Sequence, residues 1–61
     1  MLKLIIADDE KLIRDVLSRC TDWASLGVEL VAVCKDGLET FDAIQKYKPQ
    51  LVLTDIIMPG M

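Results

Sequence analysis

Residues 2–10 read LKLIIADDE, a short apolar run that ends directly at three acidic side chains. The run is rich in isoleucine and leucine and has the length of a strand, which is typical of a strand buried on both faces. It is too short for a signal peptide or a membrane span. We therefore expect a buried strand over Leu2 to Ala7, with Asp8 and Asp9 at its carboxyl end.

The segment after Glu10 has the pattern of a helix. Glu10 precedes Arg14 by four residues, an acid-before-base spacing that stabilises an exposed helix surface by about 0.3 kcal/mol. We expect this helix to end near Thr21 to Ala24, with Trp23 packing against the strand that follows. The predicted apolar face consists of Leu12, Ile13, Val16, Leu17 and Cys20.

Two further strands and a second helix are predicted in the rest of the chain. Val28 to Cys34 is a β-branched run of strand length, and Leu51 to Leu53 is a third apolar run. Between them, Asp36 precedes Glu39 by three residues, as in an N-terminal capping box, and Pro49 stops the helix that begins there. The predicted apolar face of this helix consists of Leu38, Phe41, Ile44 and Tyr47.

The order strand, helix, strand, helix, strand predicts an α/β fold with a parallel three-stranded sheet. The 61 residues are too few for two domains, so that 1–61 is one small domain or a piece of one. In such sheets ligands bind beyond the carboxyl ends of the strands, where the strand order reverses. The chemistry is therefore expected at Asp8, Asp9 and Asp55.

Composition and charge exclude several classes of protein. The chain is 52% hydrophobic with 3 Gly and 2 Pro, unlike disordered or collagen-like sequences. A net charge of -3 lacks the basic footprint that nucleic acid or an anionic membrane requires, so we expect neither as a direct partner. Cys20 and Cys34 fall within apolar patterns, and we expect both to be buried, reduced thiols of a cytoplasmic protein.

The acidic residues predict a cation site if the first and third strands are neighbours. Asp8, Asp9 and Asp55 would then meet at one edge of the sheet, where three carboxylates repel one another unless a cation neutralises them. Carboxylate and carbonyl oxygens favour Mg²⁺ or Mn²⁺. For each aspartate taken singly, the alternative is that it caps a helix or ends a strand in solvent.

Two motifs at the ends of the chain, LIIADDE at residues 4–10 and LVLTDIIMPGM at residues 51–61, resemble the receiver domain of two-component response regulators. The middle of the chain adds Asp22-Trp23, Leu26-Gly27, Glu29 and Asp36-Gly37-Leu38-Glu39. These residues resemble the receivers of regulators that carry an AraC-type DNA-binding output domain.

The resemblance implies that residues 1–61 form the N-terminal half of a flavodoxin-like receiver fold. It implies that Asp55 is the phosphoacceptor, Asp9 a direct ligand of Mg²⁺, and Asp8 a contact to the metal through water. The main-chain carbonyl of Ile57 would be a further metal ligand. In the intact parent protein, a histidine kinase would be the partner and control of transcription the output.

The family's hydroxyl residue and lysine, which contact the phosphoryl group, have no counterpart in these 61 residues. We therefore expect that this chain is not an enzyme and that it does not accumulate stable aspartyl phosphate on its own. Two alternatives to a phosphoacceptor module remain. One is a half-domain that folds by homodimerisation through the free edge of Leu51 to Leu53. The other is a small Mg²⁺-dependent phosphatase or phosphotransferase. The sequence argues against this enzyme, because the chain has no histidine and no second acid two positions after Asp55.

Overall fold

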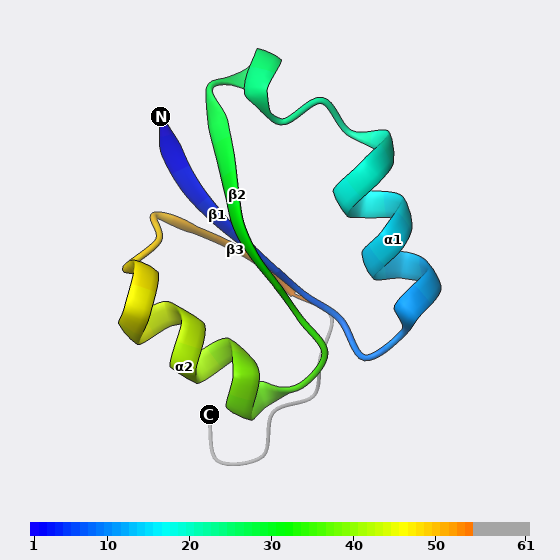
Figure 1. The fold of residues 1–61 in the computed structure, drawn as a ribbon, viewed down its shortest axis with the longest axis vertical. Helices are drawn as coiled ribbons and strands as arrows, with labels where there is room; N and C mark the ends of the chain where they lie inside the picture. Colours follow the sequence, from blue (N-terminus) through cyan, green and yellow to red (C-terminus); the bar gives the residue numbers. More distant parts are fainter. Residues whose placement is uncertain (55–61) are drawn as a thin grey trace.

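The computed structural model describes residues 1–54 of the chain (Figure 1). The elements follow one another as β1 (Leu2–Ala7), α1 (Lys11–Cys20), the 3-10 turn η1 (Ala24–Leu26), β2 (Val28–Cys34), α2 (Gly37–Tyr47) and β3 (Leu51–Thr54). This confirms the predicted alternation of strands and helices, and the structure adds a 3-10 turn that the pattern did not predict. No helix within the described part of the chain is long and apolar enough to cross a membrane.

The three strands form one parallel sheet in the order β2-β1-β3, which confirms the predicted fold class. Ala7 at the end of β1 pairs with Cys34 of β2 on one side and with Thr54 of β3 on the other. The carboxyl ends of the three strands therefore lie at the same edge of the sheet. A register shift after Leu4 adds an extra residue to β2.

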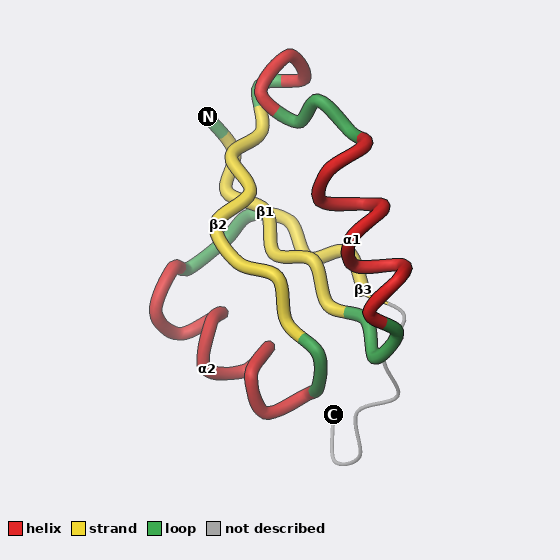
Figure 2. The backbone as a smooth tube through the Cα atoms, turned by 45° about the vertical axis from the view of Figure 1, so that its right-hand side comes forward, coloured by secondary structure: helices red, strands yellow, loops and turns green. Residues whose placement is uncertain are grey.

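The two helices cover opposite faces of the sheet, as both views show (Figures 1 and 2). The chain passes from β1 to one neighbour through α1, and then crosses back over β1 to the other neighbour through α2. Parallel strands are joined by right-handed crossovers, so a reversal of direction moves the connecting helix to the other face. The strand order reverses at β1, which is where ligands of such sheets bind.

The core is built around β1, whose side chains alternate between the two faces. Ile5 and Ala7 pack on the α2 side with Cys34 and Ala43. The α1 side holds Leu4, Ile6 and Val28, against which Leu17, Trp23 and Leu30 pack. The sequence prediction of a strand buried on both faces is thus confirmed for residues 4–7 of β1, whereas Leu2 and Lys3 are exposed.

The N-terminus of α2 has the predicted capping interaction. The Asp36 carboxylate accepts a hydrogen bond from the Glu39 backbone N–H at 2.8 Å. The Glu39 carboxylate reaches back to the backbone N–H of Lys35 at 3.1 Å, one residue before the N-cap. At the other end, Lys48 has left-handed backbone geometry, with φ 49°, and the helix stops before Pro49.

The predicted apolar face of α2 was half wrong. Leu38 and Phe41 are exposed, by 73% and 48%, and the buried residues of the helix are Thr40 and Ala43. The buried Thr40 hydroxyl donates to the Asp36 carbonyl at 2.7 Å. A buried threonine satisfied by its own helix leaves no signal in a hydrophobic pattern.

Helix α1 is less covered than its pattern predicted. It ends at Cys20, before the predicted end, and it has no buried residue. Cys20 is exposed, which overturns the prediction of a buried thiol, whereas Cys34 is buried as expected. Trp23 packs against the core cluster that contains Val28 of β2, as predicted. Its indole N–H also donates to the Leu17 carbonyl at 3.0 Å, which satisfies one carbonyl at the helix end.

Candidate functional site

The candidate site lies at the carboxyl end of β1, where the sequence predicted it. Asp8 and Asp9 follow Ala7 directly, and Ala7 pairs with Thr54 of β3. The predicted adjacency of the first and third strands is thus confirmed. Asp55 and Ile57 lie outside the described residues, as does the predicted turn at 58–60.

Asp8 is held in place by its backbone and its side chain together. Its backbone N–H donates to the Cys34 carbonyl at 3.0 Å, which extends the β1–β2 pairing by one bond. Its carboxylate accepts from the backbone N–H of Glu10 at 2.9 Å, and its carbonyl accepts from the Arg14 guanidinium at 2.8 Å. With only 4% of its surface exposed, Asp8 is a buried carboxylate in a fixed position.

Asp9 differs from its neighbour in burial and in the contacts of its side chain. Its side chain is exposed and makes no hydrogen bond or ion pair with another residue of the described range. A carboxylate of this kind can bind a cation from solvent without first breaking an interaction in the protein. The two adjacent aspartates therefore offer one fixed and one available carboxylate.

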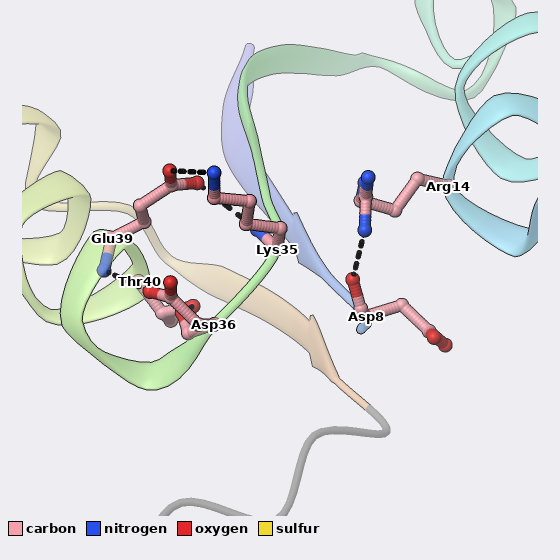
Figure 3. A network of polar contacts seen from close by, with 6 residues as sticks. All are labelled: Asp8, Arg14, Lys35, Asp36, Glu39 and Thr40. Carbon is pink, nitrogen blue, oxygen red and sulfur yellow. Dashed lines mark hydrogen bonds and ion pairs between the residues drawn. The ribbon is translucent and has the colours of Figure 1, made fainter. Parts of the chain in front are cut away.

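Arg14 is the residue near the site that sequence reasoning missed. The predicted ion pair between Glu10 and Arg14 is not formed, because the guanidinium of Arg14 reaches the Asp8 carbonyl instead (Figure 3). Figure 3 shows the Asp8 carboxylate extending away from this bond. The contact runs from a helix to a loop carbonyl, so the four-residue spacing within the helix could not reveal it.

A pocket of about 220 Å³ opens beside Asp8, between α1 and β3. Asp8 is the charged residue in its lining, and the other lining residues are Ala7, Ile13, Leu17, Leu53 and Thr54. A mainly apolar wall beside a carboxylate lowers the local dielectric constant, which strengthens the attraction of that carboxylate for a cation.

The donor set of the site fits a hard dication such as Mg²⁺. Asp8 is buried with no cationic side chain on its carboxylate within residues 1–54, and a dication would supply the missing positive charge. Mg²⁺ keeps several waters and needs only one or two carboxylates from a protein. The described residues contain no group of three acidic, histidine or cysteine side chains placed to hold a metal.

Cys34 lies next to the site, because its carbonyl accepts the hydrogen bond from the Asp8 backbone N–H. Burial raises the pKa of the Cys34 thiol, and the carboxylates of Glu39 and Asp36 add to the rise, while a hydrogen bond with Thr40 opposes it. The thiol therefore stays protonated at neutral pH, and a protonated thiol is neither a nucleophile nor a metal ligand. This supports the structural role that the sequence predicted.

Comparison with known proteins identifies related sequences over nearly the whole chain. The family model of the response regulator receiver domain matches residues 4–61. The chain is 39% identical over 61 residues to the uncharacterized transcriptional regulatory protein YesN of Bacillus subtilis strain 168. It is 41% identical over 59 residues to the transcriptional regulatory protein HptR of Staphylococcus aureus strain NCTC 8325 / PS 47.

These matches cover 100% and 97% of this chain but only 17% and 23% of the two relatives. The chain thus spans about a fifth of the length of the proteins that it matches. The matched family region includes the two acidic motifs, at residues 8–10 and at Asp55.

Proposed function

Because the chain belongs to the response regulator receiver domain family, we propose that Asp55 accepts a phosphoryl group and that Asp8 and Asp9 help to hold the Mg²⁺ that the transfer requires. One observation carries this proposal. A fixed, buried carboxylate and an exposed one stand together at the end of β1, and β1 pairs in register with β3 up to Thr54, the residue before Asp55.

Each residue has a distinct role in this proposal. Asp55 is the nucleophile, Asp9 is a direct ligand, and the carbonyl of Ile57 completes the protein's share of the coordination. Asp8 contacts the metal through water, in keeping with its burial and its hydrogen bond from Glu10. A bound Mg²⁺ neutralises charge on the incoming phosphoryl group, so that a carboxylate can approach it.

The wider role follows from the family and from the relatives. Receiver domains are phosphoacceptor modules rather than classical enzymes, and we propose a histidine kinase as the phosphoryl donor. Both relatives are named as transcriptional regulatory proteins. We therefore propose that this domain controls transcription from the cytoplasm, within a longer regulator that carries an AraC-type output domain. The net charge of -3 gives these 61 residues no basic surface for binding DNA directly.

Titration with Mn²⁺, followed by water-proton relaxation, tests the metal site. We expect weak binding by the parent chain and a clear loss in the variants Asp9→Asn and Asp55→Asn. The matched control is Asp42→Asn, which removes the same charge from an exposed position of α2. Equal binding by all four proteins would contradict the proposed site.

Treatment with acetyl phosphate and Mg²⁺, followed by intact mass measurement, tests the phosphoacceptor. In a protein that also supplies the hydroxyl and lysine donors, one phosphoryl group should be added, and Asp55→Asn should abolish the addition. The 61-residue chain alone should react at least about 100-fold more slowly, because each preorganised donor contributes a factor of ~10² to 10³. Stable labelling in the Asp55→Asn protein would refute the assignment.

A second candidate is a homodimer that pairs through β3, which one observation favours. All four residues of β3 are exposed, and the strand contacts β1 but no helix of the described range. An apolar strand exposed at the edge of a sheet promotes pairing with another chain. A homodimer joined through Leu51 to Leu53 would cover this edge in both copies.

Sedimentation equilibrium at micromolar concentration tests the homodimer. We expect Val52→Lys to dissociate or unfold the assembly, because Val52 lies in the middle of β3. Gln45→Lys, at an exposed position of α2, should leave the mass unchanged. A folded monomer in the parent chain would exclude this candidate.

A further inference from the structure

The loop between β1 and α1 is anchored on both sides of Asp8. On one side, the Asp8 backbone N–H is bonded to the end of β2 through the Cys34 carbonyl. On the other side, the Arg14 guanidinium donates to the Asp8 carbonyl at 2.8 Å, in a partly buried contact that spans six residues. The same peptide segment is therefore fixed to β2 and to α1 at once.

Arg14 donates its hydrogen bond to a neutral carbonyl although several carboxylates lie nearby in the chain. Glu10 lies one helical turn before Arg14, and the carboxylates of Asp8 and Asp9 are close by in the chain, yet Arg14 forms no ion pair with any of them. Its hydrogen bond goes to a neutral carbonyl, while the Asp8 carboxylate extends away from it (Figure 3). Arg14 thus holds the loop without neutralising the carboxylates.

We propose that Arg14 is a positioning residue of the cation site: its bond to the Asp8 carbonyl fixes the loop so that the carboxylates of Asp8 and Asp9 stay available to the metal. This inference rests on the proposed function, in which those two residues hold Mg²⁺. A charged donor makes a stronger hydrogen bond than a neutral one, so it suits this anchoring task.

A positioning role of Arg14 and a purely electrostatic role predict opposite changes in cation affinity when Arg14 is removed. A positive charge near a cation site repels the cation, so its removal would by itself tighten cation binding. The loss of a positioning contact has the opposite sign, because groups that orient metal ligands typically contribute a factor of about 10 to 100 to metal affinity. The direction of the change therefore separates the two roles.

The experiment measures the dissociation constant of Mn²⁺ in the parent chain and in the variants Arg14→Ala, Arg14→Lys and Arg19→Ala. Arg19 is the matched control because it carries the same charge on the last turn of the same helix and is exposed. We expect Arg14→Ala to weaken Mn²⁺ binding about tenfold or more relative to Arg19→Ala, and Arg14→Lys to restore part of the loss. Binding by Arg14→Ala that equals or exceeds that of Arg19→Ala overturns the proposal.

Amide hydrogen exchange gives a second readout that requires no metal. The Glu10 N–H, which donates to the Asp8 carboxylate, should exchange about tenfold faster in Arg14→Ala, because the loop loses a charged hydrogen bond. The Ile6 amide in the core strand should keep its rate, which shows that the variant is folded. An unchanged rate at Glu10 in a folded variant overturns the proposal.

The Asp9→Asn variant separates this inference from the proposed function. Loss of Mn²⁺ binding in Asp9→Asn without any loss in Arg14→Ala refutes the role of Arg14 alone. Mn²⁺ binding that is the same in Asp9→Asn as in the parent refutes the cation site, and with it the positioning role.

Discussion

β1 and β3 are both apolar strands and pair with each other residue by residue, but only one of them is buried. Ile5 pairs with Val52 and Ile6 with Leu53. Ile5 and Ile6 are 0% exposed, whereas Val52 and Leu53 are 40% and 43% exposed. Similar side chains thus have opposite environments, because burial depends on what lies on both sides of a strand and over its faces.

The position of each strand explains the difference. β1 lies between two neighbours and packs against both helices, while β3 contacts β1 alone among the described elements. Full burial of an isoleucine side chain stabilises a fold by about 1.5 to 3 kcal/mol. The described unit therefore gains more stability from β1 and from what covers it than from β3, whose apolar side chains a further chain segment or a second copy would cover more completely.

The largest effect on stability is expected from substitutions at a paired position of the two strands. Ile5→Ala should cost about 2 to 5 kcal/mol, enough to unfold a domain of this size, whereas Val52→Ala at the paired position should cost less than about 1 kcal/mol. Urea denaturation followed by circular dichroism measures both. If the two substitutions cost the same, β3 is buried in solution, as the homodimer requires.

The two helices also differ, in this case in the capping of their first turns, and the effect expected on stability is smaller. Asp36 accepts a hydrogen bond from the Glu39 N–H, while Glu10, at the corresponding position of α1, makes no capping bond with its side chain. Asp36→Ala should therefore cost about 1 kcal/mol and Glu10→Ala close to nothing. Thermal unfolding of the two variants measures the difference, and a larger cost for Glu10→Ala would contradict it.

The sequence predicted the elements better than it predicted what covers them. Strand ends at Ala7 and Cys34, the cap at Asp36 and the stop before Pro49 follow from local chemistry, and the structure has them where they were expected. The outward placement of Leu38 depends on how α2 rotates against the sheet, which is a tertiary property that no local pattern encodes.

The site divides in the same way. The position of Asp8 and Asp9 at the end of β1 follows from strand topology, so the sequence could predict where these two residues lie. The unequal burial of these adjacent aspartates could not be predicted, because it depends on how Cys34 and Arg14 hold the loop. The role of Arg14 could not be predicted, because its partner is the main-chain carbonyl of Asp8. Every residue carries such a carbonyl, so the sequence does not indicate which one is bound.

The two cysteines also differ in burial, and we expect this difference to have a still smaller effect on stability, which depends on pH. Burial raises the pKa of Cys34 above that of the unfolded chain, so on raising the pH the unfolded state loses its thiol proton first. Cys34 therefore adds stability below the ordinary thiol pKa of about 8.5, and that contribution is lost as pH rises through the higher, folded pKa. The decline should vanish in Cys34→Ala and persist in Cys20→Ala, as measured by urea denaturation between neutral and alkaline pH.

The smallest expected effects test whether the outer residues of the two helices are free in solution. Leu12 of α1 and Leu38 of α2 are 72% and 73% exposed, and they belong to helices on opposite faces of the sheet. Leu12→Gln and Leu38→Gln should each change the free energy of unfolding by less than about 0.5 kcal/mol. Because the two positions are matched in residue type and exposure, an unequal result has one meaning: the helix with the costlier substitution is covered in solution. A cost above about 1 kcal/mol at Leu12 alone would place a partner on the α1 side, where the pocket beside Asp8 also opens.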